Sequence, residues 1–528
     1  MSRLFRRIVI LLVFVIAILQ VIHISLMSRL DKKNGENVKL NKINSEPKVS
    51  GKSSFHSFDD KYDPKNVAEE REQMYNALQS LSSILDSSGE YQILAFISIA
   101  NALKNSRLTK HSSLIIGPKI GESLDGGNHN LNLYRRNDIA IVTHTTISQL
   151  YHVPLLAKRW HGLISIALFV TTIQQLPLAI EAILLLRNCN PSVRHRVSFH
   201  LVYPLSLAGK LVDQKTRIEH DYNLRWSDIV KTYPDLYQMV RKVNCGSSRL
   251  RSVIEKWDAH FAETITTNYA HQVPYPNNLL RNIARRYALT EYSLVIDVDL
   301  VPSALLYEKF IEFGKRTKLF KQWDEELVES NLSSKNALKK LVFVLPTYEI
   351  DLNRSATLRQ RHRSDINIDE DELIPGDKSD LILGIEQQTI RPFYIELCWK
   401  CQKYTDYEAW LHSSTLINST EHETRIDILF EILWHDPWEP FYISSNDVPL
   451  YDERFRQYGF NRISQVCELH MAGYRFAILN NAFLVHKGFK VQGVFHSNKD
   501  LELEHNRMLF RQFKIQLKDR YPTSNRRC

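Results

Sequence analysis

Short apolar runs alternate with stretches of helical periodicity between residues 139 and 296, and this alternation limits the chain to few folds. The strand-like runs are 139–143, 163–170, 197–202 and 293–296. The helix-like stretches lie at about 148–160, 174–188 and 277–287. Strands that alternate with helices in this way predict a mainly parallel, doubly wound α/β sheet. Such sheets bind their ligands beyond the carboxyl ends of the strands.

Two aspartates follow the last of these strand-like runs. Asp297 and Asp299 are one residue apart, directly after 293–296 and before Val301 and Pro302. Ionised carboxylates do not enter a protein core unpaired, so a buried strand that ends on two acids predicts a site. Two hard oxygen ligands at this spacing can hold Mg²⁺ or Mn²⁺, and such an ion commonly brings phosphate oxygens with it. The pair therefore indicates an enzyme that handles a metal and a phosphate.

Two reaction classes share this local motif. In nucleotide-sugar glycosyltransferases a D-x-D motif binds the metal on the donor diphosphate. In haloacid-dehalogenase-type phosphatases the pattern D-x-D-x-(T/V) makes the first aspartate a nucleophile, and residues 297–301 fit that pattern too. A turn or a salt-bridged surface pair is the structural alternative. The motif alone does not separate these interpretations.

The N-terminal segment predicts the topology of the chain. Residues 8–27 are mostly apolar and long enough to cross a bilayer as a helix. The run is long for a cleaved signal peptide, and no A-x-A-like site follows it. We therefore expect a cytosolic tail at 1–7, a transmembrane signal anchor at 8–27, a luminal stem at 28–92 and a catalytic domain at 93–528. Within the stem, helical periodicity is expected at 66–85.

Sequons, cysteines and charge agree with a luminal enzyme. Three N-x-S/T sequons predict N-glycosylation at Asn331, Asn353 and Asn418. The six cysteines permit disulfides. Cys398 and Cys401 lack the second C-x-x-C of a zinc site and a redox βαβ context, so we expect a structural disulfide, local or to another cysteine. The net charge is +9, from 68 basic and 59 acidic residues. The sequence has no basic stripe interleaved with aromatic residues, which argues against a nucleic-acid partner.

Three longer strings carry a resemblance to a known family: 274–286 (PYPNNLLRNIARR), 293–303 (SLVIDVDLVPS) and the segment 434–490 with its LVHKG string. They resemble the glycosyltransferase family that contains glucuronyltransferases and the second catalytic domain of the LARGE xylosyl-/glucuronyltransferases. The resemblance runs from about residue 136 to 528. It implies a GT-A fold, in which a nucleotide-sugar-binding mixed sheet is flanked by helices, with Mn²⁺ as cofactor and a UDP-sugar donor. The phosphatase interpretation does not account for the LVHKG string and is disfavoured.

The resemblance implies a metal site of three residues. In the family the two acids share the metal with the histidine of LVHKG, which assigns Asp297, Asp299 and His486 as ligands. His486 also follows the apolar run 482–485 and so comes at a strand end, and an imidazole with two carboxylates suits Mn²⁺. Lys487 would then offset diphosphate charge, and Gly488 would allow close approach of the backbone.

Further donor and acceptor contacts are expected around this centre. Arg281 and Asn282, on the helix before the D-x-D strand, are expected to contact the donor. Thr143, after the first strand, is expected to begin the uridine pocket, with His144 beside it. Trp438 and Tyr442 belong to an aromatic segment that is expected to stack on the acceptor sugar, with core packing as the alternative.

The family reaction inverts the anomeric configuration, so a base must take the proton of the acceptor hydroxyl. Many inverting GT-A enzymes carry this base as Glu-Asp just after a WGW-like turn. Here the turn 458–460 is followed by Asn461 and Arg462, so those carboxylates are missing. Our candidates are Asp452 and Glu439, with 436 and 453 nearby, and ion pairs with neighbouring arginines are the structural alternative.

The resemblance implies a Golgi membrane protein of type II with a luminal catalytic domain. Its expected reaction moves glucuronic acid from UDP-glucuronate, in β1,4 linkage, to a xylose-terminated O-mannosyl glycan of α-dystroglycan. A LARGE-type glycosyltransferase is the candidate protein partner. One alternative is a β1,3-N-acetylglucosaminyltransferase of poly-N-acetyllactosamine synthesis, and another is a non-catalytic Golgi scaffold for a LARGE-type partner.

Overall fold

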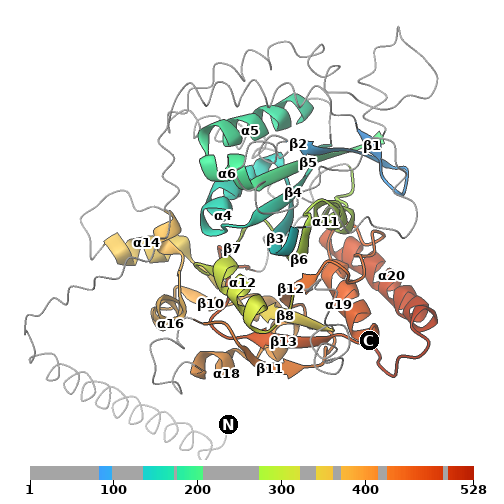
Figure 1. Cartoon of the computed structure of the whole chain (residues 1–528). Coiled ribbons are helices and arrows are strands. Elements are labelled where there is room, and N and C mark those ends of the chain that lie inside the picture. Colours follow the sequence, from blue (N-terminus) through green and yellow to red (C-terminus); the bar gives the residue numbers. More distant parts are fainter. Residues whose placement is uncertain are drawn as a thin grey trace, which may run out of the picture. The chain divides into compact units, whose positions relative to one another are not determined.

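The computed structural model describes residues 83–97, 135–171, 175–205, 273–320, 340–360, 370–413, 425–491 and 498–528 (Figure 1). The chain divides into two units, 1–62 and 63–528, and every described residue belongs to the second. A search of the described helices finds none that is both long and apolar enough to cross a membrane. The expected anchor at 8–27 and the sequons at Asn331 and Asn418 lie outside the described residues.

The described strands are β1 (Ile84–Leu85), β2 (Tyr91–Ile97), β3 (Arg135–Thr146), β4 (Leu163–Phe169), β5 (Val197–Pro204), β6 (Thr290–Val295), β7 (Leu300–Pro302), β8 (Leu341–Leu345), β9 (Thr347–Ile350), β10 (Ile390–Pro392), β11 (Ile428–Ile432), β12 (Phe441–Ser445), β13 (Arg475–Leu479) and β14 (Leu484–Lys487). They form a ten-stranded sheet in the order β1-β2-β5-β4-β3-β6-β12-β8-β13-β11 and a four-stranded sheet in the order β10-β9-β14-β7.

The described helices are η3 (Ile147–His152), α4 (Val153–Arg159), α5 (Gln175–Cys189), α6 (Pro191–Arg196), α11 (Asn277–Arg286), α12 (Leu306–Arg316), α14 (Leu352–Gln360), α15 (Glu370–Leu373), α16 (Lys378–Glu386), α17 (Ile395–Cys398), η4 (Trp399–Cys401), η5 (Lys403–Thr405), α18 (Tyr407–His412), α19 (Asn461–Met471) and α20 (Lys499–Arg520).

The large sheet is mixed, and the expected strand direction holds for its centre only. β5, β4, β3 and β6 are parallel neighbours, as the alternation of strands and helices predicts. β12 runs antiparallel to both β6 and β8, and β2 runs antiparallel to β5. The expectation of a mainly parallel sheet is therefore wrong outside this centre, whereas an α/β mixed sheet flanked by helices is confirmed. The strands that break the pattern lie outside the stretch 139–296.

Both faces of the parallel centre are covered by helices. Along β3, Ile139 and Ile141 join a core that contains residues of α4, α5 and α12. The intervening Ala140 and Val142 join a second core with residues of α11. Successive side chains of a strand point to opposite faces, so this division is the period of two that a doubly covered strand requires. In Figure 1 α4, α5 and α6 lie together on the side of the sheet away from α11.

The ten-stranded sheet begins before residue 93, within the segment 28–92 that was expected to be the stem. β1 pairs with β2, and β2 pairs with β5. The Asp86 carboxylate closes the turn between them, because it accepts hydrogen bonds from the backbone N–H of Ser88 at 3.0 Å and of Tyr91 at 2.8 Å. Ile84 and Leu85, at the end of the expected helix 66–85, are therefore strand and not helix.

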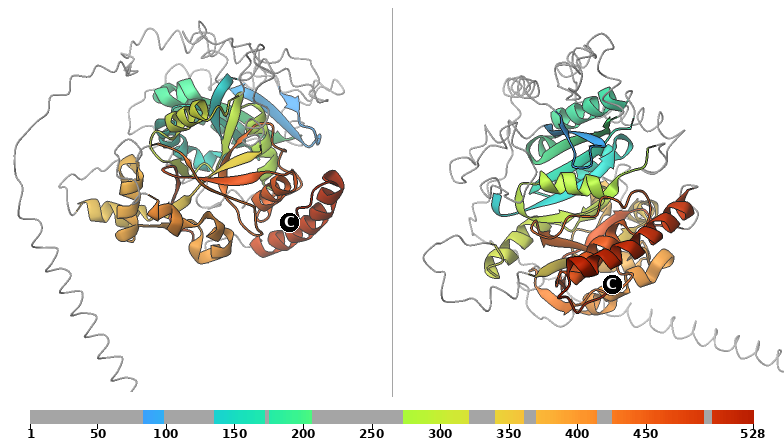
Figure 2. Two further views of the ribbon diagram at one scale, coloured as in Figure 1. Left: turned by 60° about the horizontal axis from the view of Figure 1, so that its bottom comes forward. Right: turned by 90° about the vertical axis from the view of Figure 1, so that its right-hand side faces the viewer.

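Two disulfides constrain the C-terminal half. Cys398 is bonded to Cys401, which confirms a structural disulfide and gives it the local pairing. Cys467 of α19 is bonded to Cys528 at the chain terminus. The long C-terminal helix α20 lies beside α19 in the views of Figures 1 and 2.

Candidate active site

The registers of both sheets bring the paired acids to their neighbours. β3 and β6 are parallel, with Val142 opposite Val295. His144 therefore comes beside Asp297, since each lies two residues beyond this pair. In the small sheet β14 runs antiparallel to β7 and places His486 opposite Leu300. Asp299 accordingly faces the end of β14, although 187 residues separate it from His486.

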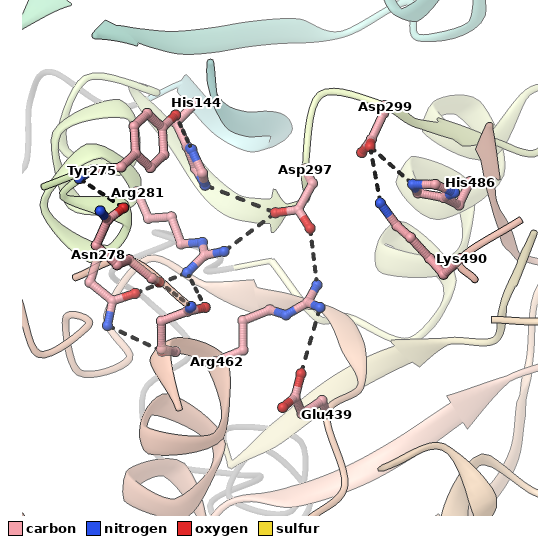
Figure 3. Close-up of polar contacts among 12 residues, drawn as sticks. His144, Tyr275, Asn278, Arg281, Asp297, Asp299, Glu439, Arg462, His486 and Lys490 are labelled. Atoms are coloured by element: carbon pink, nitrogen blue, oxygen red, sulfur yellow. Dashed lines mark hydrogen bonds and ion pairs between the residues drawn. The ribbon is translucent and has the colours of Figure 1, made fainter. Parts of the chain in front are cut away.

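Asp297 is held by two arginines (Figure 3). Its Oδ1 accepts a hydrogen bond from Arg281 Nη2 at 3.3 Å, and its Oδ2 accepts one from Arg462 Nη1 at 3.3 Å. His144 Nε2 lies 3.9 Å from Oδ1. Burial raises the pKa of Asp297, but the two guanidinium groups outweigh it and hold this pKa below its usual range. Asp297 is therefore an ionised carboxylate in a basic setting.

Asp299 points the other way, toward His486. His486 Nε2 lies 2.9 Å from Asp299 Oδ2, and Lys490 Nζ lies 3.9 Å from the same oxygen. Burial raises the pKa of Asp299, but His486 and Lys490 outweigh it and hold this pKa well below its usual range. Asp299 Oδ1 is buried and makes no hydrogen bond. Among the described residues, this oxygen is thus a buried acceptor without a donor.

Gly488 orients the histidine ring. His486 Nδ1 lies 2.7 Å from the Gly488 carbonyl oxygen and donates to it, because a carbonyl can only accept. The other ring nitrogen, Nε2, faces Asp299. It donates to Oδ2 when it carries a proton and can bind a metal when it does not. Gly488 has φ of +85°, in the left-handed region that favours glycine. The turn that brings its carbonyl back to the ring depends on this conformation.

The donor atoms of Asp299 and His486 decide whether a divalent ion suits this place. Within the part of the chain that the structure describes, no group of three His, Cys, Asp or Glu side chains is placed to hold a metal ion. The structure brings Asp299 and His486 together but turns Asp297 toward the arginines. A carboxylate oxygen without a partner, next to an imidazole nitrogen, is a donor set that Mn²⁺ accepts. The residues present thus fit such an ion at Asp299 and His486.

The predicted donor contacts fall into two groups. Arg281 reaches the site, and its Nη1 also donates to the side-chain oxygens of Asn278 and Asn461, each at 2.9 Å. Lys487 adjoins the site through its backbone N–H, which donates to the Asp299 carbonyl at 3.2 Å. Asn282 does not reach Asp297.

The Asn282 amide is used by a neighbouring loop instead. Its Nδ2 donates to the Tyr451 carbonyl and to Glu453 Oε1, each at 2.8 Å, and its Oδ1 accepts from the Tyr451 N–H at 2.9 Å. Thr143 is fully buried in β3, and its Oγ1 makes no hydrogen bond. The neighbouring His144 is the β3 side chain that reaches the acids.

Of the two base candidates, only Glu439 lies at the site. Arg462, which holds Asp297, also places Nη2 3.6 Å from Glu439 Oε2 (Figure 3). Burial raises the pKa of Glu439, and Arg462 opposes this rise only in part. Asp452 is committed to Arg454, whose Nε donates to Oδ1 at 2.9 Å and whose Nη2 donates to Oδ2 at 2.5 Å.

Trp438 and Tyr442, the predicted acceptor residues, belong to the core. Trp438 is fully buried, and its Nε1 donates to Thr405 Oγ1 at 3.0 Å. Tyr442 is buried in β12 and packs edge-on against Phe476. Stacking on a sugar requires an exposed ring face, which neither residue offers. The expectation of acceptor stacking is corrected to core packing for both.

Two site residues, Arg462 and Lys490, were not predicted from the sequence, and a third was predicted in another role. At the position of Arg462, after the turn 458–460, the pattern of many inverting GT-A enzymes predicts a carboxylate and not a cation. Lys490 lies two residues beyond the LVHKG string, where its charge was the available signal. His144 was placed only in a uridine pocket. Burial, followed by the charge of Arg281, lowers its pKa to about 3, so its ring is neutral. Its Nδ1 lies 2.8 Å from the Tyr275 hydroxyl.

The chain is similar in sequence to known glycosyltransferases. Residues 138–522 match the model of a family described as a glycosyl-transferase for dystroglycan. A β-1,4-glucuronyltransferase 1 from Danio rerio is 34% identical over 527 residues, which cover 99% of this chain and 98% of that protein. The Homo sapiens β-1,4-glucuronyltransferase 1 is 37% identical over 394 residues, or 74% of this chain and 78% of that protein.

A more distant relative extends the comparison. The xylosyl- and glucuronyltransferase LARGE1 of Homo sapiens is 25% identical over 212 residues, which cover 40% of this chain and 22% of that protein. The resemblance carried by the strings around Asp297 and His486 is thereby confirmed at the level of the family. This chain belongs to the family of dystroglycan glycosyltransferases that contains the β-1,4-glucuronyltransferases 1.

Proposed function

We propose that this chain is a Mn²⁺-dependent, inverting glucuronyltransferase of GT-A type. Its donor is UDP-glucuronate, and its acceptor is a xylose-terminated O-mannosyl glycan of a dystroglycan-like protein. The observation that carries the proposal is the pairing of Asp299 with His486 beside an Asp297 held by two arginines. Membership of a family with glucuronyltransferase relatives supports the sugar.

Asp299 and His486 would hold the ion, with Asp297 as the third predicted ligand. When bound, the ion neutralises negative charge that develops on the departing diphosphate. The protein adds fixed positive charge around the same place, from Arg281 and Arg462 on one side and Lys490 on the other. Groups held in place in this way stabilise developing charge without reorganising during the reaction.

The surrounding side chains fix the protonation of the centre. His144 stays neutral and adds no charge beside Asp297. The Gly488 carbonyl accepts a hydrogen bond from His486 Nδ1 and so orients Nε2 toward Asp299. Glu439, beside Arg462, is the carboxylate nearest to this centre among our two base candidates.

The proposed topology places this body in the Golgi lumen. It combines a tail at 1–7, a membrane anchor at 8–27 and a stem that ends before β1 rather than at residue 92. Asn353 is exposed at the start of α14 and suits a luminal N-glycan. A LARGE-type glycosyltransferase, which would extend the product, is the proposed protein partner.

The proposal is tested by transfer from radiolabelled UDP-glucuronate to a β-xyloside, with UDP-N-acetylglucosamine as the competing donor. We expect transfer of glucuronate with Mn²⁺ and its loss with a chelator. Asp299→Asn should lose both transfer and Mn²⁺-dependent binding of UDP, measured by calorimetry. Asp519→Asn, at an exposed acid of α20, is the matched control and should keep both. Wild-type protein that binds Mn²⁺-UDP but transfers no glucuronate would refute the proposed sugar.

A further inference from the structure

The disulfide loop 398–401 is hydrogen-bonded to the segment that carries Glu439. The backbone N–H of Glu439 donates to the Cys401 carbonyl at 2.9 Å. The side-chain Nε2 of Gln402 donates to the Glu439 carbonyl at 3.4 Å. Both backbone polar groups of Glu439 are thus bound by residues that adjoin the disulfide.

This contact is continued on both sides. Trp438, the residue before Glu439, donates from Nε1 to Thr405 Oγ1 at 3.0 Å. Gln402 is itself buried, and its backbone N–H donates to the Trp399 carbonyl at 3.0 Å. Residues 401–405 therefore form a fixed support under residues 438–439.

The Glu439 side chain leaves this support toward the paired acids. Its carboxylate lies 3.6 Å from Arg462 Nη2, and the Glu439 side chain is 24% exposed. Arg462 Nη1 is the group that donates to Asp297 at 3.3 Å. Glu439 and Asp297 are thereby placed on two nitrogens of one guanidinium, whose planar fork fixes the geometry between them.

We propose that Glu439 is the catalytic base and that the Cys398–Cys401 disulfide loop is its positioning element. The proposal rests on the proposed function and adds to it the base and the way in which the base is held. In the step, the acceptor hydroxyl oxygen forms the bond to the anomeric carbon of the donor sugar. The bond from that carbon to the UDP oxygen breaks, and its electron pair leaves with UDP. Glu439 takes the hydroxyl proton.

The raised pKa of Glu439, which burial causes, agrees with this role because a base works best when its pKa is near the working pH. The disulfide is suited to positioning rather than to global stability. Cys398 and Cys401 are 3 residues apart in sequence, whereas Cys467 and Cys528 are 61 apart. The entropy that a disulfide removes from the unfolded chain grows with the length of the closed loop.

The two disulfides therefore give a matched comparison in the full-length protein. The double variant Cys398→Ser/Cys401→Ser should lower kcat about tenfold or more, since a misplacement of about 1 Å can cost about a hundredfold. Its affinity for Mn²⁺-UDP and its melting temperature should change little. Cys467→Ser/Cys528→Ser should show the opposite result, with a lower melting temperature and an unchanged kcat.

Glu439 is tested directly by substitution and chemical rescue. Glu439→Ala should lower kcat by about a hundredfold to ten-thousandfold, the usual contribution of a general base. Added formate, a small carboxylate, should restore part of the lost rate while Mn²⁺-UDP affinity stays at the wild-type value. Formate should not restore the Cys398→Ser/Cys401→Ser variant, which keeps its own carboxylate.

Three results would overturn the proposal: a Glu439→Ala variant with kcat within about twofold of wild type, an absence of formate rescue, or a disulfide variant that loses kcat and Mn²⁺-UDP affinity in equal proportion. These results do not depend on whether the proposed donor sugar is correct. If the wild-type enzyme transfers a sugar other than glucuronate, the same variants measure the base on that sugar.

Discussion

Acid should destabilise this fold through its buried histidines, and His200 is the clearest case. His200 is fully buried in β5 and stacks on Tyr287 with ring centroids 4.8 Å apart. Its Nε2 lies 2.9 Å from Ser165 Oγ, whose hydrogen is donated to the Ala284 carbonyl. The ring is therefore neutral with its proton on Nε2. Burial lowers the pKa of His200 to about 3.

The size and direction of the effect follow from this shift. The unfolded chain binds a proton at His200 below about pH 6.5, whereas the folded protein stays neutral down to about pH 3. Between these values the unfolded state holds more protons, so the free energy of unfolding falls as the pH falls. At pH 5 the loss from this one residue is about 2 kcal/mol, and it grows toward pH 3. His144 and His152, each with a pKa lowered to about 3, act in the same direction.

The assay compares denaturant-induced unfolding at pH 7 and pH 5. His200→Gln keeps a donor for Ser165 but removes the titrating group, so its fall in unfolding free energy should be about 2 kcal/mol smaller than that of wild type. His505→Gln, at an exposed position of α20, is the control and should keep the wild-type fall. The reasoning would be refuted if His200→Gln lost as much stability between the two pH values as wild type does.

Three other substitutions test the site and its support. Arg462→Ala should weaken UDP binding about tenfold or more by calorimetry, because it removes a cation from the centre, while Arg507→Ala on the exposed face of α20 should not. Gly488→Ala should lower Mn²⁺ affinity in a titration, because the φ of +85° is strained for alanine even though its Cβ would meet no atom within 4 Å. Glu349→Leu should lower the free energy of unfolding in denaturant by about 1–3 kcal/mol, because the Lys490 N–H loses its buried acceptor and Arg391 keeps only its exposed partner Glu396. Glu349→Leu/Arg391→Leu should be less destabilised than the single variant.

The parallel centre and the paired acids were predictable because their signals are local. The runs around Ile141 and Leu294 consist of apolar residues, and this composition predicts buried strands. The two acids follow directly after the second run. The register that places His144 beside Asp297 comes from the structure and not from these local signals. His486 could be assigned because a specific string carries it, although its partner lies 187 residues away.

The rest depends on pairings that no local pattern encodes. β12 lies between β6 and β8 and runs against both, which the sequence around Ile443 does not reveal. Trp438 is of a residue type that often stacks on sugars, and only the tertiary packing shows that its ring is buried. Arg462 stands where the pattern of inverting enzymes predicts a carboxylate, and only the tertiary structure shows its guanidinium beside Asp297.

The D-x-D motif lies in the segment that connects the two sheets. β6 ends at Val295 in the ten-stranded sheet, and β7 begins at Leu300 in the four-stranded sheet. A UDP–metal ligand that engages both the surroundings of Asp297 and the Asp299–His486 pair would cross-link the two sheets. Since such a ligand binds only where both sheets are folded, its binding free energy adds to the free energy of unfolding. At about a hundred times its Kd, the gain is about 2.7 kcal/mol.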